Sequence, residues 1–250
     1  MAPAAYSFWL PRRGSSPAEY EDAFALDDRA GRYALADGAT EGCFTGLWAR
    51  LLVEDFVHGS DCPAGRWPTS LLAAQQRWDA EVRGRRLPWY AEAGVSQGAF
   101  ATFLGLVLTP PAGMVYRWQA AAVGDTCLMH TRGAAVLAAF PLDRAGQFDN
   151  VPSLVGSRAS LEGVRRRRRV WDEGCGQRGD RLWAMTDALA HCCLSEHEAG
   201  GNPWGALEAL LAAPPEGNLF AAWIEGLRTA GRLRNDDVTL LAIPLEEAGP

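Results

Sequence analysis

The chain has 250 residues, of which 48 % are apolar and 22 % charged, a composition typical of a soluble globular protein. Its formal net charge of −6 argues against general binding to nucleic acids or anionic membranes. No stretch of about 18 apolar residues is present, so no membrane span is expected. The N-terminus lacks the basic start and apolar core of a signal peptide, and the cysteines form no CxxC motif. We therefore expect a cytoplasmic protein with reduced thiols.

The N-terminal third begins with residues 1–20, which we interpret as an extended segment followed by a loop. Residues 23–26 and 32–36 are short apolar runs joined by an Asp- and Gly-containing turn, a pattern that predicts an antiparallel hairpin. Glu21 and Asp22 precede the first run, and Asp37 follows the second. Antiparallel pairing would bring these acids to the same end of the sheet.

In the middle of the chain the spacing of apolar residues changes twice, first to a helical pattern and then to one typical of strands. Apolar residues at helical spacing predict a helix over 44–57 and a second one that begins at 68–70. Short apolar runs then predict strands over 100–108, 114–123, 127–130 and 135–140. Because short turns join these runs, they favour antiparallel meanders over βαβ crossovers. Residues 141–164 are expected to form long loops.

The C-terminal part opens with five consecutive arginines, residues 165–169, which we interpret as an edge strand with solvated side chains in preference to a phosphate-seeking patch. A strand is predicted over 180–186, helices over 188–194, 204–213 and 219–230, and a final strand over 238–243. No linker or repeat divides the chain. We therefore predict one domain over 1–245 and a tail over 246–250.

Three acids share the same local setting, the end of an apolar run. Asp37 and Asp187 each follow such a run, and Asp236 stands just before the final one. Side chains at strand ends can converge outside a sheet, where clustered carboxylates repel one another unless a cation neutralises them. Carboxylate and carbonyl oxygens are the ligands that hard divalent cations prefer. This arrangement favours a divalent metal cluster.

Five motifs, in their residues and in their order along the chain, resemble those of the metal-dependent PPM, or PP2C-type, serine/threonine protein phosphatases. The motifs are Glu21-Asp22-Ala23-Phe24, Ala36-Asp37-Gly38, Ala122-Val123-Gly124-Asp125-Thr126, Gly179-Asp180-Arg181-Leu182 with Thr186-Asp187-Ala188-Leu189, and Asn235-Asp236-Asp237-Val238-Thr239. They span about residues 15 to 244 in the order of the family. The resemblance implies an α+β fold, a PP2C-like central antiparallel β-sandwich flanked by helices on both faces in four αββα layers.

The function that the resemblance implies is hydrolysis of phosphoserine and phosphothreonine by a hydroxide activated by two Mn²⁺ or Mg²⁺ ions. Its partners would be phosphorylated proteins, including targets of a cognate Ser/Thr kinase, with no nucleic acid and no membrane. Asp37 would bridge the two ions, and the Gly38 carbonyl would bind one of them. Asp187 and Asp236 would complete the shell of the other ion. Asp125 matches an acid that can recruit a third, weaker metal in this family.

The resemblance assigns Glu21 and Asp22 to holding metal-bound water. It also exposes a departure, because the phosphate-binding Arg expected four residues before this pair is replaced by Pro17. Arg12 or Arg13 from the preceding loop could substitute for it. Weak phosphate anchoring would reduce activity without removing the metals.

Two alternatives to a phosphatase remain open. The first is a PPM-fold regulatory or binding module with weak or no catalysis. The second is a serine hydrolase, because Gly94-Val95-Ser96-Gln97-Gly98 matches GxSxG, with Asp187 and His191 or His197 downstream. That motif requires a strand before it and a helix after it, the reverse of the pattern around Ser96.

Overall fold

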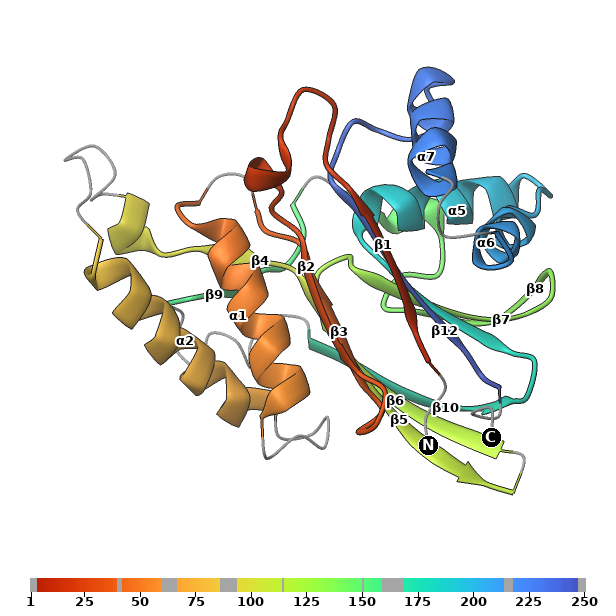
Figure 1. The fold of residues 1–250 in the computed structure, drawn as a ribbon, viewed down its shortest axis with the longest axis horizontal. Helices are drawn as coiled ribbons and strands as arrows, with labels where there is room; N and C mark the ends of the chain where they lie inside the picture. Colours follow the sequence, from red (N-terminus) through yellow and green to blue (C-terminus); the bar gives the residue numbers. More distant parts are fainter. Residues whose placement is uncertain are drawn as a thin grey trace.

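The computed structural model describes residues 4–39, 42–59, 67–85, 94–113, 115–149, 151–158, 169–213 and 218–246. Two five-stranded antiparallel sheets face each other at the centre, and helices cover the outer face of each (Figure 1). The four-layer αββα sandwich implied by the motifs is therefore confirmed.

The first sheet has the strand order β10-β6-β5-β3-β2. Its strands are β2 (Ala23–Asp27), β3 (Arg32–Ala36), β5 (Phe103–Ala112), β6 (Val115–Val123) and β10 (Arg169–Gln177). Helices α1 (Thr45–His58) and α2 (Trp67–Arg83) lie on its outer side (Figure 1). The predicted hairpin is present, since Ala23 pairs with Ala36 and Asp27 with Arg32.

The second sheet has the strand order β1-β12-β11-β7-β8. Its strands are β1 (Tyr6–Leu10), β7 (Cys127–Arg132), β8 (Ala135–Phe140), β11 (Arg181–Met185) and β12 (Val238–Pro244). Helices α5 (Asp187–Glu198), α6 (Pro203–Leu211) and α7 (Leu219–Thr229) cover its outer side (Figure 1). The chain passes from the first sheet to the second at two short turns, one between β6 and β7 and one between β10 and β11.

Apolar side chains fill three layers. The layer between the sheets contains Tyr33, Leu35, Trp118 and Leu241. The layer under α1 and α2 includes Trp48, Phe56 and Trp78, and the layer under α5 to α7 includes Trp183, Trp204 and Ile224. Full burial of each large apolar side chain contributes about 1.5–3 kcal/mol, so these layers hold the strand ends in fixed positions.

Several elements differ from the prediction. Residues 6–10 form β1, which pairs with β12, where only an extended segment and a loop were expected. The predicted strand over 100–108 is divided into β4 (Phe100–Ala101) and β5, and β4 pairs with β9 (Val155–Gly156) from the expected loop region. The structure also has two short 3₁₀ helices where loops were expected, η1 (Pro17–Glu19) before β2 and η3 (Ala145–Gln147) after β8. The unexpected strands arise from pairing between distant segments, which local patterns do not reveal.

The arginine run lies mostly outside the described residues, which resume at Arg169, the first residue of the edge strand β10. Cys62 and the tail after residue 246 also lie outside them. The cysteines of the described part of the chain are free, among them the adjacent buried Cys192 and Cys193. In the same residues no helix is long and apolar enough to cross a membrane.

Candidate active site

Strand pairing brings the predicted acids to one edge of the sandwich. In the first sheet, the pairing of Ala23 with Ala36 places Asp22 and Asp37 at adjacent strand ends. In the second sheet, Met185 pairs with Leu240, so the end of β11 and the start of β12 also meet. Asp187 follows the former, and Asp236 precedes the latter.

Asp125 lies at the same edge, in the turn that joins the two sheets. This turn leaves β6 at Val123, which pairs with Phe103 at the start of β5. It enters β7 at Cys127, which pairs with Met185 at the end of β11. Acids from both sheets and from their connection therefore face a common region.

Asp37 experiences the combined charge of this cluster. Burial raises the pKa of Asp37 well above its usual range, and the charges of Asp22, Asp236 and Asp125 raise it further. A carboxylate with this environment is strained in its ionised form unless a cation lies nearby. The charges thus indicate a site that attracts positive ligands.

Gly38 fixes the backbone beside Asp37. Its N–H donates to the carbonyl oxygen of Glu21 at 3.2 Å, and the carbonyl of Asp37 accepts from the N–H of Thr102 at 2.9 Å. A Cβ at position 38 would lie 2.7 Å from the Glu21 carbonyl oxygen and 3.1 Å from the backbone of Thr45. Only glycine allows β2, β3 and α1 to approach this closely.

Asp22 is buried beside Asp37, and its two carboxylate oxygens differ in their contacts. Its Oδ2 accepts a hydrogen bond from Thr239 Oγ1 at 2.7 Å, and the Tyr20 hydroxyl contacts the same Thr239 hydroxyl. Its Oδ1 is buried without a hydrogen-bond partner. Burial raises the pKa of Asp22 to about 7, and the charge of Asp237 adds to this, against the opposing effects of hydrogen bonds with Thr239, Thr186 and Asp37.

Asp125 shows the same feature, since its Oδ1 is also buried without a partner. Burial raises the pKa of Asp125 to about 6, and the charges of Asp149 and Asp236 add to this increase. The charge of Arg234 acts in the opposite direction. A buried carboxylate oxygen without a donor is unfavourable unless a cation satisfies it. The two unpartnered oxygens, one on Asp22 and one on Asp125, are therefore suited to a divalent cation or to a water molecule bound to one.

Asp187 and Asp236 are joined by an arginine that the sequence analysis did not identify. Arg234 Nη2 pairs with Asp187 Oδ2, and its Nε lies 3.1 Å from Asp236 Oδ2. In the part of the chain that the structure describes, no three Asp, Glu, His or Cys side chains are arranged together to hold a metal ion. Arg234 supplies positive charge to this half of the site.

Two further residues missed by the sequence analysis hold the loops around the site. Asp237 accepts hydrogen bonds from the backbone N–H groups of Arg12 at 2.8 Å and Glu21 at 2.9 Å. The buried Arg228 of α7 donates to the carbonyl oxygens of Pro11 at 3.1 Å and Asp236 at 2.5 Å. These contacts fasten the β1–β2 connection to the loop before β12. The Asp-Asp pair was visible in the sequence, but the partners of its second member were not.

The two candidate phosphate-binding arginines differ in position. Arg12 Nη1 pairs with Glu21 Oε2 at 3.1 Å, and Thr45 Oγ1 donates to the other Glu21 oxygen at 2.6 Å. Arg13 is directed to α7, where its Nη2 donates to the Glu225 carbonyl oxygen at 2.9 Å. The structure therefore does not bring Arg13 to the acid cluster, because α7 holds its guanidinium.

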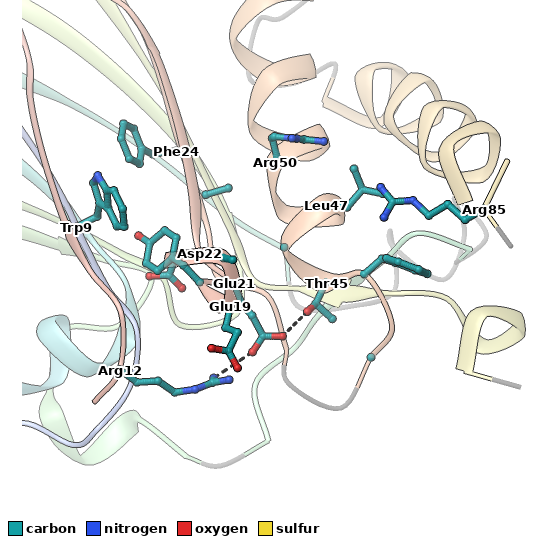
Figure 2. Close-up of a pocket in the computed structure, with 16 residues that line it drawn as sticks. Trp9, Arg12, Glu19, Glu21, Asp22, Phe24, Thr45, Leu47, Arg50 and Arg85 are labelled. Carbon is teal, nitrogen blue, oxygen red and sulfur yellow. Dashed lines mark hydrogen bonds and ion pairs between the residues drawn. The ribbon is translucent and has the colours of Figure 1, made fainter. Parts of the chain in front are cut away.

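A cleft of about 760 Å³ opens beside Glu21 and Asp22. Figure 2 shows Arg12 on the side of the β1–β2 connection, with Arg50 and Arg85 across the cleft on the side of α1 and α2. Aromatic residues line both sides, and the guanidinium of Arg85 lies 4.8 Å from the ring centre of Phe44. Asp22 is the member of the acid cluster that lines this cleft, so the cleft adjoins the cluster at its margin.

The serine hydrolase alternative gains no support from the geometry. Ser96 lies in a helical turn over residues 94–97 and is followed by β4, so no helix follows it as that motif requires. Its neighbour Val95 packs in the layer under α1 and α2. His191 contacts Phe148, and His197 contacts Trp204 in the layer on the opposite side of the sandwich.

The architecture is that of the PPM, or PP2C-type, serine/threonine phosphatases. The serine/threonine phosphatase PstP/Ppp of Mycobacterium tuberculosis is similar with a TM-score of 0.63 and 17% sequence identity, over 99% of this chain and 100% of that one. The structure of the PstP catalytic domain in complex with two manganese ions has a TM-score of 0.58 and 19% sequence identity, over 96% of this chain and 97% of that one. PppA, a key regulatory component of T6SS in Pseudomonas aeruginosa, has a TM-score of 0.58 and 18% sequence identity, over 97% of each chain. No family model and no curated protein sequence matches the chain.

Proposed function

We propose that the chain is a metal-dependent phosphoprotein phosphatase that hydrolyses phosphoserine and phosphothreonine. The observation that carries this proposal is the convergence of acids from both sheets at one edge, where Asp22 and Asp125 each keep a buried oxygen without a partner. Such oxygens are stabilised by a hard divalent cation, for which carboxylates are preferred ligands. The residues present therefore fit the metals that the resemblance implies.

The ligand set follows from the position of each acid. Asp37 and the Gly38 carbonyl would serve the metals from the first sheet, with Asp37 as the bridge. Asp187 and Asp236 would serve from the second sheet, and Asp125 from the connection would serve a third ion. This all-oxygen set suits either Mn²⁺ or Mg²⁺. When bound, such ions lower the pKa of water and stabilise negative charge on phosphoryl oxygens.

The remaining residues of the site would hold water and substrate. Asp22, held by Thr239 through Oδ2, keeps its buried Oδ1 beside Asp37, where it would accept a hydrogen bond from a water molecule. Glu21 already accepts from Thr45 and Arg12, so its role here is to hold the Arg12 guanidinium at the cleft. Arg12 is then the candidate for binding phosphoryl oxygens, because a guanidinium matches their geometry.

The cleft beside the cluster would receive the polypeptide that carries the phosphorylated side chain. Arg50 and Arg85 supply positive charge, and Trp9 and Phe44 supply apolar surface. This composition suits a phosphorylated protein segment, including one modified by a cognate Ser/Thr kinase. The cytoplasmic location expected from the sequence stays a prediction.

The test is Mn²⁺- and Mg²⁺-dependent hydrolysis of p-nitrophenyl phosphate and of a phosphothreonine peptide. Asp37→Ala and Asp187→Ala should each reduce kcat by at least about a hundredfold, as loss of a group that stabilises transition-state charge does. Ser96→Ala should keep wild-type activity, since Ser96 lies outside the cluster. A wild-type protein no more active than these Asp variants with either metal would overturn the proposal.

A second candidate function is a module that binds phosphoproteins without hydrolysing them. The observation in its favour is the pairing of Arg234 with Asp187 and Asp236, which neutralises part of the cluster without a metal. Fluorescence anisotropy of a labelled phosphothreonine peptide in EDTA separates the two functions. Tight metal-independent binding by a protein that lacks hydrolytic activity would favour the module.

A further inference from the structure

Arg234 binds Asp187 and Asp236 through one edge of its guanidinium. Its Nη2 and Nε contact one oxygen from each carboxylate, although Asp187 belongs to α5 and Asp236 to the loop before β12. Two donors of one planar group can do this only where the two carboxylates lie close together. A single cation could bridge the same two oxygens.

The remaining oxygen of each carboxylate is bound to the backbone. Asp187 Oδ1 accepts from the N–H of Ala188 at 2.5 Å, and Asp236 Oδ1 accepts from the N–H of Asp237 at 3.0 Å. The Oδ2 atoms are thus the oxygens directed to a cation, and Arg234 contacts both of them. A divalent ion that binds here must compete with this guanidinium.

The environment of Arg234 allows it to leave. Its side chain is 49% exposed, whereas that of Asp187 is only 9% exposed. A released guanidinium would regain full hydration, but a buried carboxylate left without a cation would be costly. The position therefore requires a positive group, and the group can be exchanged.

We propose that Arg234 is an internal counter-ion that occupies the cation position between Asp187 and Asp236, and that a divalent metal binds there by displacing it. The proposal rests on the metal site of the proposed function. Metal affinity is set by an exchange of cations and not by the acids alone.

The first test is Mn²⁺ binding measured by isothermal titration calorimetry. Arg234→Gln should bind Mn²⁺ about tenfold more tightly than wild type, since two ion pairs no longer oppose the metal. Without metal, the same variant should melt at a lower temperature than wild type, and saturating Mn²⁺ should remove that difference. Arg232→Gln is the matched control, because Arg232 is 50% exposed and pairs with Glu196 instead. Equal Mn²⁺ affinity in all three proteins would overturn the proposal.

A second measurement does not depend on the folding of a variant under metal-free conditions. In wild-type protein, the Arg234 Nε–H signal in an ¹⁵N NMR spectrum, assigned by its absence from Mg²⁺-loaded Arg234→Gln, should shift when Mg²⁺ is added. A signal that stays in place while signals around Asp187 report Mg²⁺ binding would also overturn the proposal.

Failure of the proposed function is distinguishable from failure of this exchange. A wild-type protein that hydrolyses no phosphoester, yet binds Mn²⁺ more weakly than Arg234→Gln, supports the exchange and contradicts only the phosphatase. The same holds if only Arg234→Gln binds Mn²⁺. If neither protein binds Mn²⁺ or Mg²⁺, the exchange is wrong.

Discussion

The carboxylate of Asp237 accepts a hydrogen bond from the backbone N–H of Glu21, a residue 216 positions earlier in the chain, at 2.9 Å. Its other oxygen accepts from the backbone N–H of Arg12 at 2.8 Å. One side chain from the loop before β12 thereby fixes the segment that leads into β2 of the first sheet. The position of Asp22, one residue after Glu21, depends on this contact.

Asp237→Ala should lower the free energy of unfolding by about 2–3 kcal/mol, because it leaves two backbone N–H groups without an acceptor. Urea unfolding at pH 7 measures the change. Asp237→Asn keeps one acceptor oxygen and should lose less. If Asp237→Ala unfolds at the wild-type urea concentration, the contact does not stabilise the fold.

Gly38→Ala should destabilise the protein by about 1–3 kcal/mol, the usual cost of forcing an extra methyl group into a packed region. The new Cβ would lie 2.7 Å from the Glu21 carbonyl oxygen. Gly226→Ala is the matched control, since Gly226 lies in α7 with no atom within 4 Å of an added Cβ. Alanine there should stabilise α7 by up to about 1 kcal/mol. Thermal melts of both variants should therefore shift in opposite directions, and a shift in the same direction would contradict the packing argument.

Asp180 should make stability fall in acid. It is fully buried and accepts hydrogen bonds from Arg132 Nε at 2.6 Å and His130 Nε2 at 2.9 Å. Burial by itself raises the pKa of Asp180, but the hydrogen bonds from Arg132, Gln177 and His130 outweigh it and lower the pKa below its ordinary value. A lowered pKa contributes stability above the unfolded pKa of about 3.9, and this stability is lost as pH falls through the folded pKa.

Asp180→Asn should therefore lower the free energy of unfolding by about 3 kcal/mol at pH 7, because it leaves the donors with a weaker partner. Below pH 4, the free energy of unfolding should fall less steeply in this variant than in wild type. Urea unfolding from pH 7 to pH 3 gives both quantities. The exposed Asp143→Asn should follow the wild-type curve. If the free energy of unfolding falls equally steeply below pH 4 in wild type and Asp180→Asn, other groups cause the loss of stability in acid.

Arg85→Ala should raise KM for a phosphothreonine peptide about fivefold, the effect of losing one exposed charge contact. Hydrolysis of p-nitrophenyl phosphate should stay unchanged, because this small substrate does not extend along the cleft. Arg83→Ala removes a charge two residues away that pairs with Asp79 outside the cleft, and it should affect neither substrate. An equal rise in KM for both substrates would place Arg85 nearer the reacting phosphate than the cleft geometry implies.

The helices, most strands and the predicted acids could be derived from the sequence because each stands beside a strong local signal. Asp37 stands one residue after the end of β3, and Asp187 stands two residues after the end of β11, so each acid follows an apolar run that the sequence shows. Antiparallel pairing then places the start of β2 beside the end of β3, and the start of β12 beside the end of β11. The sandwich architecture was predicted from the order of the motifs, because the spacing of apolar residues alone does not specify it.

The remainder depends on contacts between distant segments. β1 is a strand because β12 pairs with it, and Arg234 bridges acids from two different elements. Arg12 and Arg13 are adjacent and chemically identical, yet one lines the cleft and the other pairs with α7. No spacing rule distinguishes such neighbours, because their roles are set by which element passes nearby.

The position of β12 has a consequence for how the molecule is made. Synthesis proceeds from the N-terminus, and β12 is the last strand in the chain, yet it lies between β1 and β11 in its sheet. During translation, β1 has no partner strand until residues 238–242 have left the ribosome. Asp236, which completes the acid cluster, and Thr239, which donates a hydrogen bond to Asp22, arrive with the same part of the chain. We therefore expect closure of the second sheet and assembly of the site to be one late event, so that a nascent chain lacking β12 has neither.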